Sequence, residues 1–237
     1  MANSYFQFKE FRIEQGKSAM KVCTDACIQG AWTPVHSGVR RVLDVGAGTG
    51  LLSLMLAQRT PAAVIDAVEL DSSAAQQASE NVAASPWSSR VRVIRGDARS
   101  FPAVAPYDLI ICNPPFFRHA LLGPTDSRNI ARHTLQLSYN DLFDILHLHL
   151  AATGYASILL PVDEHFHWKA LVESKGWHIR HELHVFPKGG TPANRIISLC
   201  SPVSTTNVVS ENLIIRNPEG RYTPEFTHLL QPFYLML

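Results

Sequence analysis

The chain has 237 residues, of which 46% are hydrophobic and 17% are charged, and its formal net charge at pH 7 is +1. This length fits one sizeable domain, and the apolar fraction is sufficient for a folded core, which excludes a disordered chain. No apolar run is long enough to span a bilayer, and the polar and aromatic start, Met1 to Lys9, is unlike a signal peptide. We therefore expect a cytoplasmic protein with no membrane partner.

Strands and helices are predicted to alternate through most of the chain. In chain order we expect a strand at 41–45, a helix at 50–58, a strand at 64–69, a helix at 71–84, strands at 90–95 and 107–112, a helix at 139–151, a strand at 154–160, a helix at 163–175, strands at 177–186 and 194–201, a strand through 213–215 and a helix at 224–230. This order predicts an α/β fold with a Rossmann-like, doubly wound, mostly parallel seven-stranded sheet and a C-terminal antiparallel hairpin. We divide this single domain into an N-terminal extension (1–35), a core (36–202) and a C-terminal extension (203–237) packed on the core.

Cysteines and histidines give no strong metal signal. Cys23 and Cys27 form the only close pair among four cysteines, and C-x-x-x-C without a second pair favours reduced thiols over a zinc site. His178, His181 and His184 recur every third residue, but their segment alternates like a strand, on which such positions point to opposite faces. We therefore predict no metal.

A glycine loop follows the strand at 41–45. Gly46, Gly48 and Gly50 are spaced G-x-G-x-G, one residue tighter than the dinucleotide pattern, and no Lys-Ser/Thr follows to make a phosphate P-loop. With Asp44 just before it, this loop suits the methionine part of S-adenosylmethionine, whose ammonium needs an acceptor and whose backbone must be approached closely. The alternative is a tight strand-to-helix turn with no ligand.

Acidic residues end the next two strands. Glu69 lies about twenty residues past the glycines, where a carboxylate can accept both ribose hydroxyls. Asp97 follows the strand at 90–95 and is placed to accept the exocyclic amine of adenine. Each acid alone is also typical of a helix cap or a solvated strand end. In series, they predict a ligand site along the carboxyl edge of one parallel sheet.

A fourth motif follows the glycine loop and the two acidic strand ends. It consists of Asn113, Pro114, Pro115 and Phe116, directly after the apolar strand at 107–112. A planar nitrogen is a poor nucleophile because its lone pair is delocalised, and a carboxamide oxygen and a prolyl carbonyl can both accept its hydrogens. The prolines hold these acceptors in place, and the phenyl ring can stack on a base. The alternative is a proline-rich turn after a buried strand.

These motifs resemble those of class I S-adenosylmethionine-dependent methyltransferases, and among them the amino-methyltransferases with N-P-P-[YF]. Further likeness, spread over nearly the whole chain, is to the bacterial tRNA1(Val) adenine N6-methyltransferase family. It is carried by Phe8, Lys9, Phe11, Ala19, Met20, Lys21, Val22, Thr24, Asp25, Gly30, Ala31, Trp32, the segment 44–50, Ala67, Val68, Glu69, Ser85, Pro86, Trp87, Arg132, Phe233, Tyr234 and Leu235. Cys23 and Ala26 depart from the glycines usual in relatives, and Phe116 and Phe117 from the commoner tyrosines.

The resemblance implies methyl transfer from S-adenosylmethionine to the N6 amine of adenosine 37 in the anticodon loop of tRNA1(Val). Asn113, Pro114, Pro115 and Phe116 would be catalytic. The implied cofactor-binding residues are Lys21, Val22, Thr24, Asp25, Asp44, Gly46, Gly48, Gly50, Glu69, Leu70, Asp97, Ala98 and Asn113.

For RNA binding we expect Arg118, Arg128 and Arg132, which follow the Asn-Pro-Pro motif, although the net charge of +1 is small for a nucleic-acid binder. Two alternatives stay open. One is a methyltransferase for another planar amine, in ribosomal RNA guanine, DNA adenine or protein glutamine. The other is a Rossmann-like nucleotide-binding module without catalysis.

Overall fold

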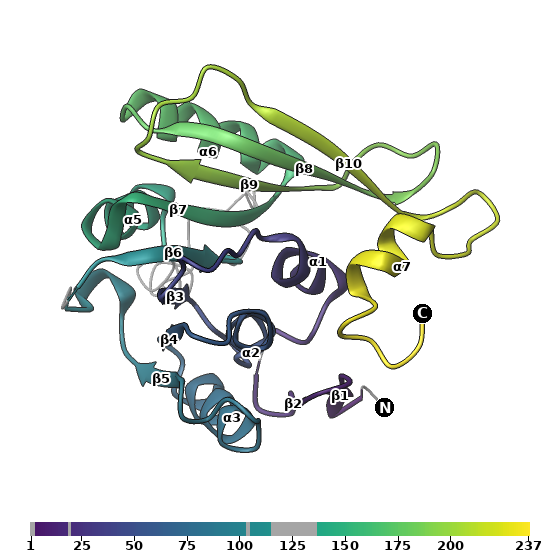
Figure 1. Ribbon diagram of the computed structural model, residues 1–237, viewed down its shortest axis with the longest axis horizontal. Coiled ribbons are helices and arrows are strands. Elements are labelled where there is room, and N and C mark those ends of the chain that lie inside the picture. Colours follow the sequence, from purple (N-terminus) through teal and green to yellow (C-terminus); the bar gives the residue numbers. More distant parts are fainter. Residues whose placement is uncertain (1–2, 19, 103–104, 115–136) are drawn as a thin grey trace, which may run out of the picture.

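The computed structural model describes residues 3–18, 20–102, 105–114 and 137–237. Its centre is an eight-stranded sheet in the order β10-β8-β9-β7-β6-β3-β4-β5 (Figure 1). The strands are β3 (Arg41–Val45), β4 (Val64–Glu69), β5 (Val91–Arg95), β6 (Tyr107–Cys112), β7 (Leu150–Pro161), β8 (His178–Lys188), β9 (Arg195–Ser201) and β10 (Val209–Arg216), with a separate hairpin of β1 (Tyr5–Gln7) and β2 (Arg12–Glu14). The helices are α1 (Thr24–Trp32), α2 (Leu51–Arg59), α3 (Ser72–Ala83), the short 3₁₀ turn η1 (Ala98–Ser100), α5 (Tyr139–His149), α6 (Val162–Ser174) and α7 (Pro224–Leu230).

The α/β class and the mostly parallel sheet are confirmed, but the expected strand count of seven is wrong. Of the eight strands, β9 alone runs antiparallel to its neighbours, so β8 and β9 form the expected hairpin. The segment through Leu213 is β10, which pairs in parallel with the outer edge of β8. Leu213 is buried there, and the added strand satisfies backbone groups that the edge of β8 would otherwise expose.

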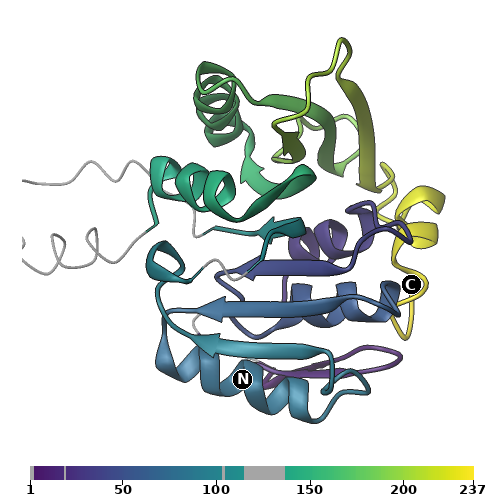
Figure 2. The same ribbon diagram turned by 60° about the vertical axis from the view of Figure 1, so that its left-hand side comes forward.

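Alternating strand residues divide the core into two layers. Val42 and Leu109 belong to the cluster under α1, α2 and α7, while Leu43 and Ile110 face the cluster under α5 and α6. This is the period of two expected where both faces of a sheet are covered by helices. Figures 1 and 2 show the resulting three layers, with helices on both sides of the twisted sheet.

Several elements differ from the prediction. The hairpin of β1 and β2 was not predicted, and the strand expected at 154–160 begins earlier, at Leu150. The helix expected to reach residue 151 ends at His149, because Leu150 already pairs with Tyr107 in the sheet. Helix α1 was not predicted, because its residues from Ala26 to Ala31 are all buried and leave no polar face to set a helical period. Among the described residues, no helix is long and apolar enough to cross a membrane.

The strand order creates a crevice at one edge of the sheet. From β3 the chain passes to β4 and β5 on one side, and then returns to β6 on the other side of β3. Such a reversal separates the connections that follow neighbouring strands, and ligands of open α/β folds bind in the crevice outside the carboxyl ends. The glycine loop after β3 and Asn113 after β6 therefore lie on its two sides.

Candidate functional site

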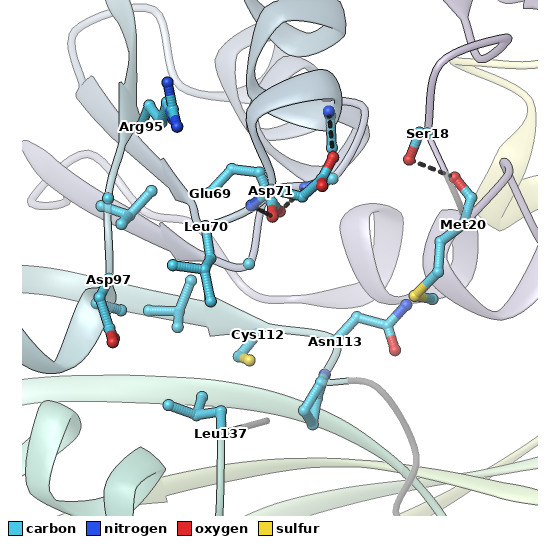
Figure 3. Close-up of a pocket in the computed structure, with 18 of the residues that line it drawn as sticks. Ser18, Met20, Glu69, Leu70, Asp71, Arg95, Asp97, Cys112, Asn113 and Leu137 are labelled. Carbon is cyan, nitrogen blue, oxygen red and sulfur yellow. Dashed lines mark hydrogen bonds between the residues drawn. The ribbon is translucent and has the colours of Figure 1, made fainter. Parts of the chain in front are cut away.

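A cavity of about 620 Å³ opens at the carboxyl ends of β3, β4, β5 and β6. This volume lies in the range of small-molecule sites, roughly 300–1,000 Å³. Figure 3 shows side chains gathering around it from the separate strand ends. Its described lining consists of Ser18, Met20, Val45, Gly46, Gly48, Val68, Glu69, Leu70, Asp71, Ser72, Ala74, Arg95, Gly96, Asp97, Ala98, Arg99, Cys112, Asn113, Pro114 and Leu137.

The glycine loop forms one wall with bare backbone. Gly46 and Gly48 have φ values of 73° and 56°, a left-handed conformation that favours glycine. A Cβ at either position would meet no atom within 4 Å, so the missing side chains leave open space beside the backbone. A ligand can therefore approach this backbone closely. Gly50 is the N-cap that precedes α2, has a φ of 81° and is not part of the described lining.

Glu69, at the end of β4, is held by two backbone amides. Gly48 N–H donates to its Oε2 at 2.8 Å, and Asp71 N–H donates to its Oε1 at 2.8 Å. One carboxylate therefore joins the glycine loop to the start of α3. Each carboxylate oxygen has a second lone pair, so the group can still accept hydrogen bonds from a ligand. Two hydroxyl groups on adjacent carbon atoms of a ligand would be donors with a spacing that suits the two carboxylate oxygens.

Asp97 lines the cavity after β5, beside the buried Ala98. Its Oδ2 lies 2.6 Å from the Arg99 guanidinium, and its Oδ1 accepts a hydrogen bond from the Arg99 backbone at 2.9 Å. Hydrogen bonding to Arg99 lowers the pKa of Asp97 below its usual value. The carboxylate is therefore a hydrogen-bond acceptor at the cavity, and an amine N–H is a suitable donor to it.

Asn113 extends from the end of β6 into the cavity, next to Pro114. Its Oδ1 is buried and has no hydrogen-bond partner among the described residues. Burying a polar atom without a hydrogen bond typically costs about 1–3 kcal/mol of stability. A donor on a bound ligand could supply the missing hydrogen bond. Pro115, Phe116, Arg118, Arg128 and Arg132 lie outside the described residues.

Asp44 lies beneath the loop and is not among the described lining residues. Its side chain is fully buried, and its Oδ2 accepts hydrogen bonds from Ser53 N–H at 3.0 Å and from Ser53 Oγ–H at 2.6 Å. Oδ1 is buried without a partner among the described residues. Burial raises the pKa of Asp44 to about 7, partly offset by the bonds from Ser53. Its direct contact with a ligand stays a prediction.

This pKa gives the free protein a specific pH dependence. Because the folded pKa of about 7 exceeds the ordinary 3.8, the folded state binds a proton that the unfolded state releases. The free energy of unfolding should therefore rise by about 2–3 kcal/mol as the pH falls from 8 to 5. Asp44→Asn cannot ionise and should lack this contribution. Denaturant melts of both proteins across this pH range measure the difference, and parallel pH curves would contradict the assignment.

The N-terminal residues that were predicted to bind the cofactor do not line the described cavity, unlike most of the other predicted residues. Lys21, Val22, Thr24 and Asp25 are not among the described lining residues, whereas the nearby Ser18 and Met20 are. Asp25 Oδ2 instead pairs with Arg195 Nε at 3.0 Å, which ties the start of α1 to β9. A role for these four residues in covering a ligand stays a prediction.

Several lining residues were not predicted. Arg95 is the last residue of β5. Its position at the carboxyl end of a strand could have predicted that it lines the cavity. Leu137 directly precedes the capping box of Ser138 and Asp141 that starts α5, so recognition of this box would have placed it beside the crevice. Ser18 and Met20 carry no such local signal, because long-range contacts place them. In the described part of the chain, no group of three or more His, Cys, Asp or Glu residues could hold a metal ion.

Comparisons with known proteins agree with this geometry. The methyltransferase small domain family matches residues 33–140. A tRNA1(Val) (adenine(37)-N6)-methyltransferase of Tolumonas auensis is 45% identical over 100% of this chain and 99% of its own length. A protein of the same name from Dyadobacter fermentans is 41% identical, with 98% of each chain covered. Among solved structures, a predicted O-methyltransferase from Agrobacterium tumefaciens shares the fold, with a TM-score of 0.64 and 18% identity over 88% of this chain and 96% of its own.

Proposed function

Since the chain belongs to the tRNA1(Val) (adenine(37)-N6)-methyltransferase family, we propose that it transfers a methyl group from S-adenosylmethionine to the N6 amine of adenosine 37 in the anticodon loop of tRNA1(Val). The observation that carries this proposal is the full-length match at 45% identity to a relative of that name. The cavity supports it independently, because it combines a nucleoside-sized site with an acceptor, Asn113 Oδ1, that has no partner in the part of the chain that the structure describes.

The residues of the cavity fit S-adenosylmethionine. Glu69 would accept the ribose hydroxyls, and Asp97, an ionised acceptor next to Ala98, would accept the adenine amine. Gly46 and Gly48 leave the backbone open beside the methionine part, and Leu70 adds an apolar wall. Asp44 and Gly50 would support this loop from below. When bound, the cofactor supplies an activated methyl group carried on a positively charged sulfur.

Asn113 would orient the acceptor nitrogen. Its Oδ1, which has no described partner within residues 3–18, 20–102, 105–114 and 137–237, would accept one N–H of the target amine, and the Pro114 carbonyl would accept the other. Two such hydrogen bonds favour a pyramidal nitrogen, whose lone pair is then available for attack. Catalysis in this proposal comes mainly from proximity and orientation, and the proton leaves to solvent as the new bond forms. Pro115 and Phe116 would complete the pocket, with the phenyl ring stacked on the adenine.

The other expected roles are part of the same proposal. Residues 1–35 would cover the cofactor with Lys21, Val22, Thr24 and Asp25, residues 36–202 would form the catalytic core, and residues 203–237 would pack on that core. Arg118, Arg128 and Arg132 would contact the RNA backbone. Neutralising them should weaken binding and flatten its salt dependence.

The function is tested by methyl transfer in vitro. The protein is incubated with labelled S-adenosylmethionine and total tRNA from cells that lack the modification, and nucleosides from separated tRNAs are identified by mass spectrometry. We expect N6-methyladenosine confined to tRNA1(Val). Label found in ribosomal RNA, DNA or protein instead of tRNA would show that the proposed acceptor is wrong and would identify the true one. No label anywhere would overturn the enzymatic function in favour of a binding module.

A further inference from the structure

The segment 14–18 is fastened to α3 by two buried amide side chains. Asn81, only 2% exposed, accepts a hydrogen bond from Glu14 N–H at 2.9 Å and donates one to Glu14 O at 2.9 Å. Gln77, 3% exposed, accepts a hydrogen bond from Lys17 N–H at 3.1 Å. Asn81 thus pairs with both backbone groups of one residue, as a neighbouring strand would. A buried amide with so many partners fixes its neighbours, because each lost bond would leave a polar group unpaired.

Asn81 also reaches the glycine loop. Its Nδ2 donates to Thr49 O at 2.9 Å, and Thr49 lies between Gly48 and Gly50. One carboxamide therefore holds two segments that are far apart in sequence, the N-terminal segment and the loop. Two donated bonds and one accepted bond use both N–H groups of the side chain and its oxygen.

Both segments border the same cavity. Ser18 and Met20 follow the fastened residues and line the cavity, and Figure 3 shows them on the side that Asn113 also faces. Gly46 and Gly48 line it from the loop. Helix α3 begins beside Glu69, whose Oε1 accepts the Asp71 N–H. The same helix thus contacts the proposed ribose acceptor at its start and the N-terminal segment near its end.

We propose that Asn81 is a positioning residue for the cofactor site, which holds Ser18 and Met20 over the cavity and fixes the glycine loop through Thr49. The proposal rests on the proposed function, because it takes S-adenosylmethionine as the ligand. Gln77 is the second anchor, which holds the N-terminal segment at Lys17 and has no described bond to the glycine loop. Neither side chain lines the cavity in the described structure, so each acts through the backbone that it holds.

The test compares three alanine variants of neighbouring residues on α3. Asn81→Ala loses both connections, and Gln77→Ala loses the bond from Lys17 N–H together with a 3.3 Å bond to Glu80. Gln76→Ala is the matched control, because its described bond is to the same exposed Glu80. Calorimetry gives Kd for S-adenosylmethionine. Limited trypsin digestion at Lys17 and Lys21, with and without this ligand, reports how firmly the N-terminal segment is held.

For Asn81→Ala we expect Kd to rise about thirtyfold and cleavage at Lys17 and Lys21 to remain fast when the ligand is present. Gln77→Ala should show faster cleavage with a rise in Kd of only about threefold, and Gln76→Ala should match the parent protein. If Asn81→Ala does not fold, Gln77→Ala decides the result by its cleavage rate and Kd.

A lower Tm with unchanged Kd or unchanged cleavage would overturn the proposal, because a purely structural residue would act on stability alone. The proposed function fails in a different way. If the parent protein does not bind S-adenosylmethionine, the function and this inference both fall. If the parent binds and transfers methyl groups while the Asn81 and Gln77 variants equal it in Kd and cleavage, the inference alone falls.

Discussion

Asn113→Ala is expected to lower kcat for methyl transfer about a thousandfold and to leave cofactor binding nearly intact. The side-chain oxygen is the proposed acceptor for the amine in the transition state, and losses of roughly 10²–10³ follow removal of one such preorganised group. Because Oδ1 is buried and has no hydrogen-bond partner among the described residues, its removal should not lower the Tm. Single-turnover rates with tRNA and calorimetry with S-adenosylmethionine measure the two effects separately.

The control for this experiment is Asn212→Ala on β10, whose side chain is exposed. It removes the same chemical group from a strand distant from the crevice and should retain the parental rate. If the rate of Asn113→Ala were within a few-fold of the parental rate, Asn113 would not be a catalytic residue. A large rise in Kd for the cofactor would instead identify Asn113 mainly as a cofactor ligand.

Glu69→Gln should raise Kd for S-adenosylmethionine about 100-fold. The carboxylate accepts hydrogen bonds from Gly48 N–H and Asp71 N–H, whereas a carboxamide presents one N–H to a backbone donor. The substitution therefore loosens the loop as well as weakening the ribose acceptor. Hydrogen bonds to a charged group contribute roughly 1.5–3 kcal/mol each, which corresponds to this loss when one or two are impaired.

Calorimetry measures this effect, with Glu173→Gln on the exposed side of α6 as the matched control. The control should bind the cofactor like the parent. The comparison with Asn113→Ala is informative, since that variant should keep its affinity while Glu69→Gln loses it. Equal affinities for Glu69→Gln and the parent would exclude Glu69 as a ribose acceptor.

Most of the predicted elements agree with the structure because their signals are local. The strand at 107–112 has the predicted bounds, and the helix from Pro224 to Leu230 is capped by Thr223, which accepts the Phe226 N–H. A buried strand is visible as an apolar run, and a helix start is visible as a capping residue followed by proline. The parts that were missed lack such signals, as in α1, whose residues from Ala26 to Ala31 are all buried and show no helical alternation of apolar and polar faces.

The sequence by itself determined most of the order of strands and helices from residue 41 onward and the residues at the predicted strand ends, because alternating apolar residues, glycine spacing and capping residues are local signals. From these it indicated the site of Gly46, Gly48, Glu69, Asp97 and Asn113. Only the tertiary structure decided which residues complete that site. Met20 lines the cavity next to a segment to which Asn81 and Gln77, sixty or more residues away, are hydrogen-bonded, and Ser53 binds Asp44 beneath the loop. Such contacts depend on packing between distant segments, which no local pattern encodes.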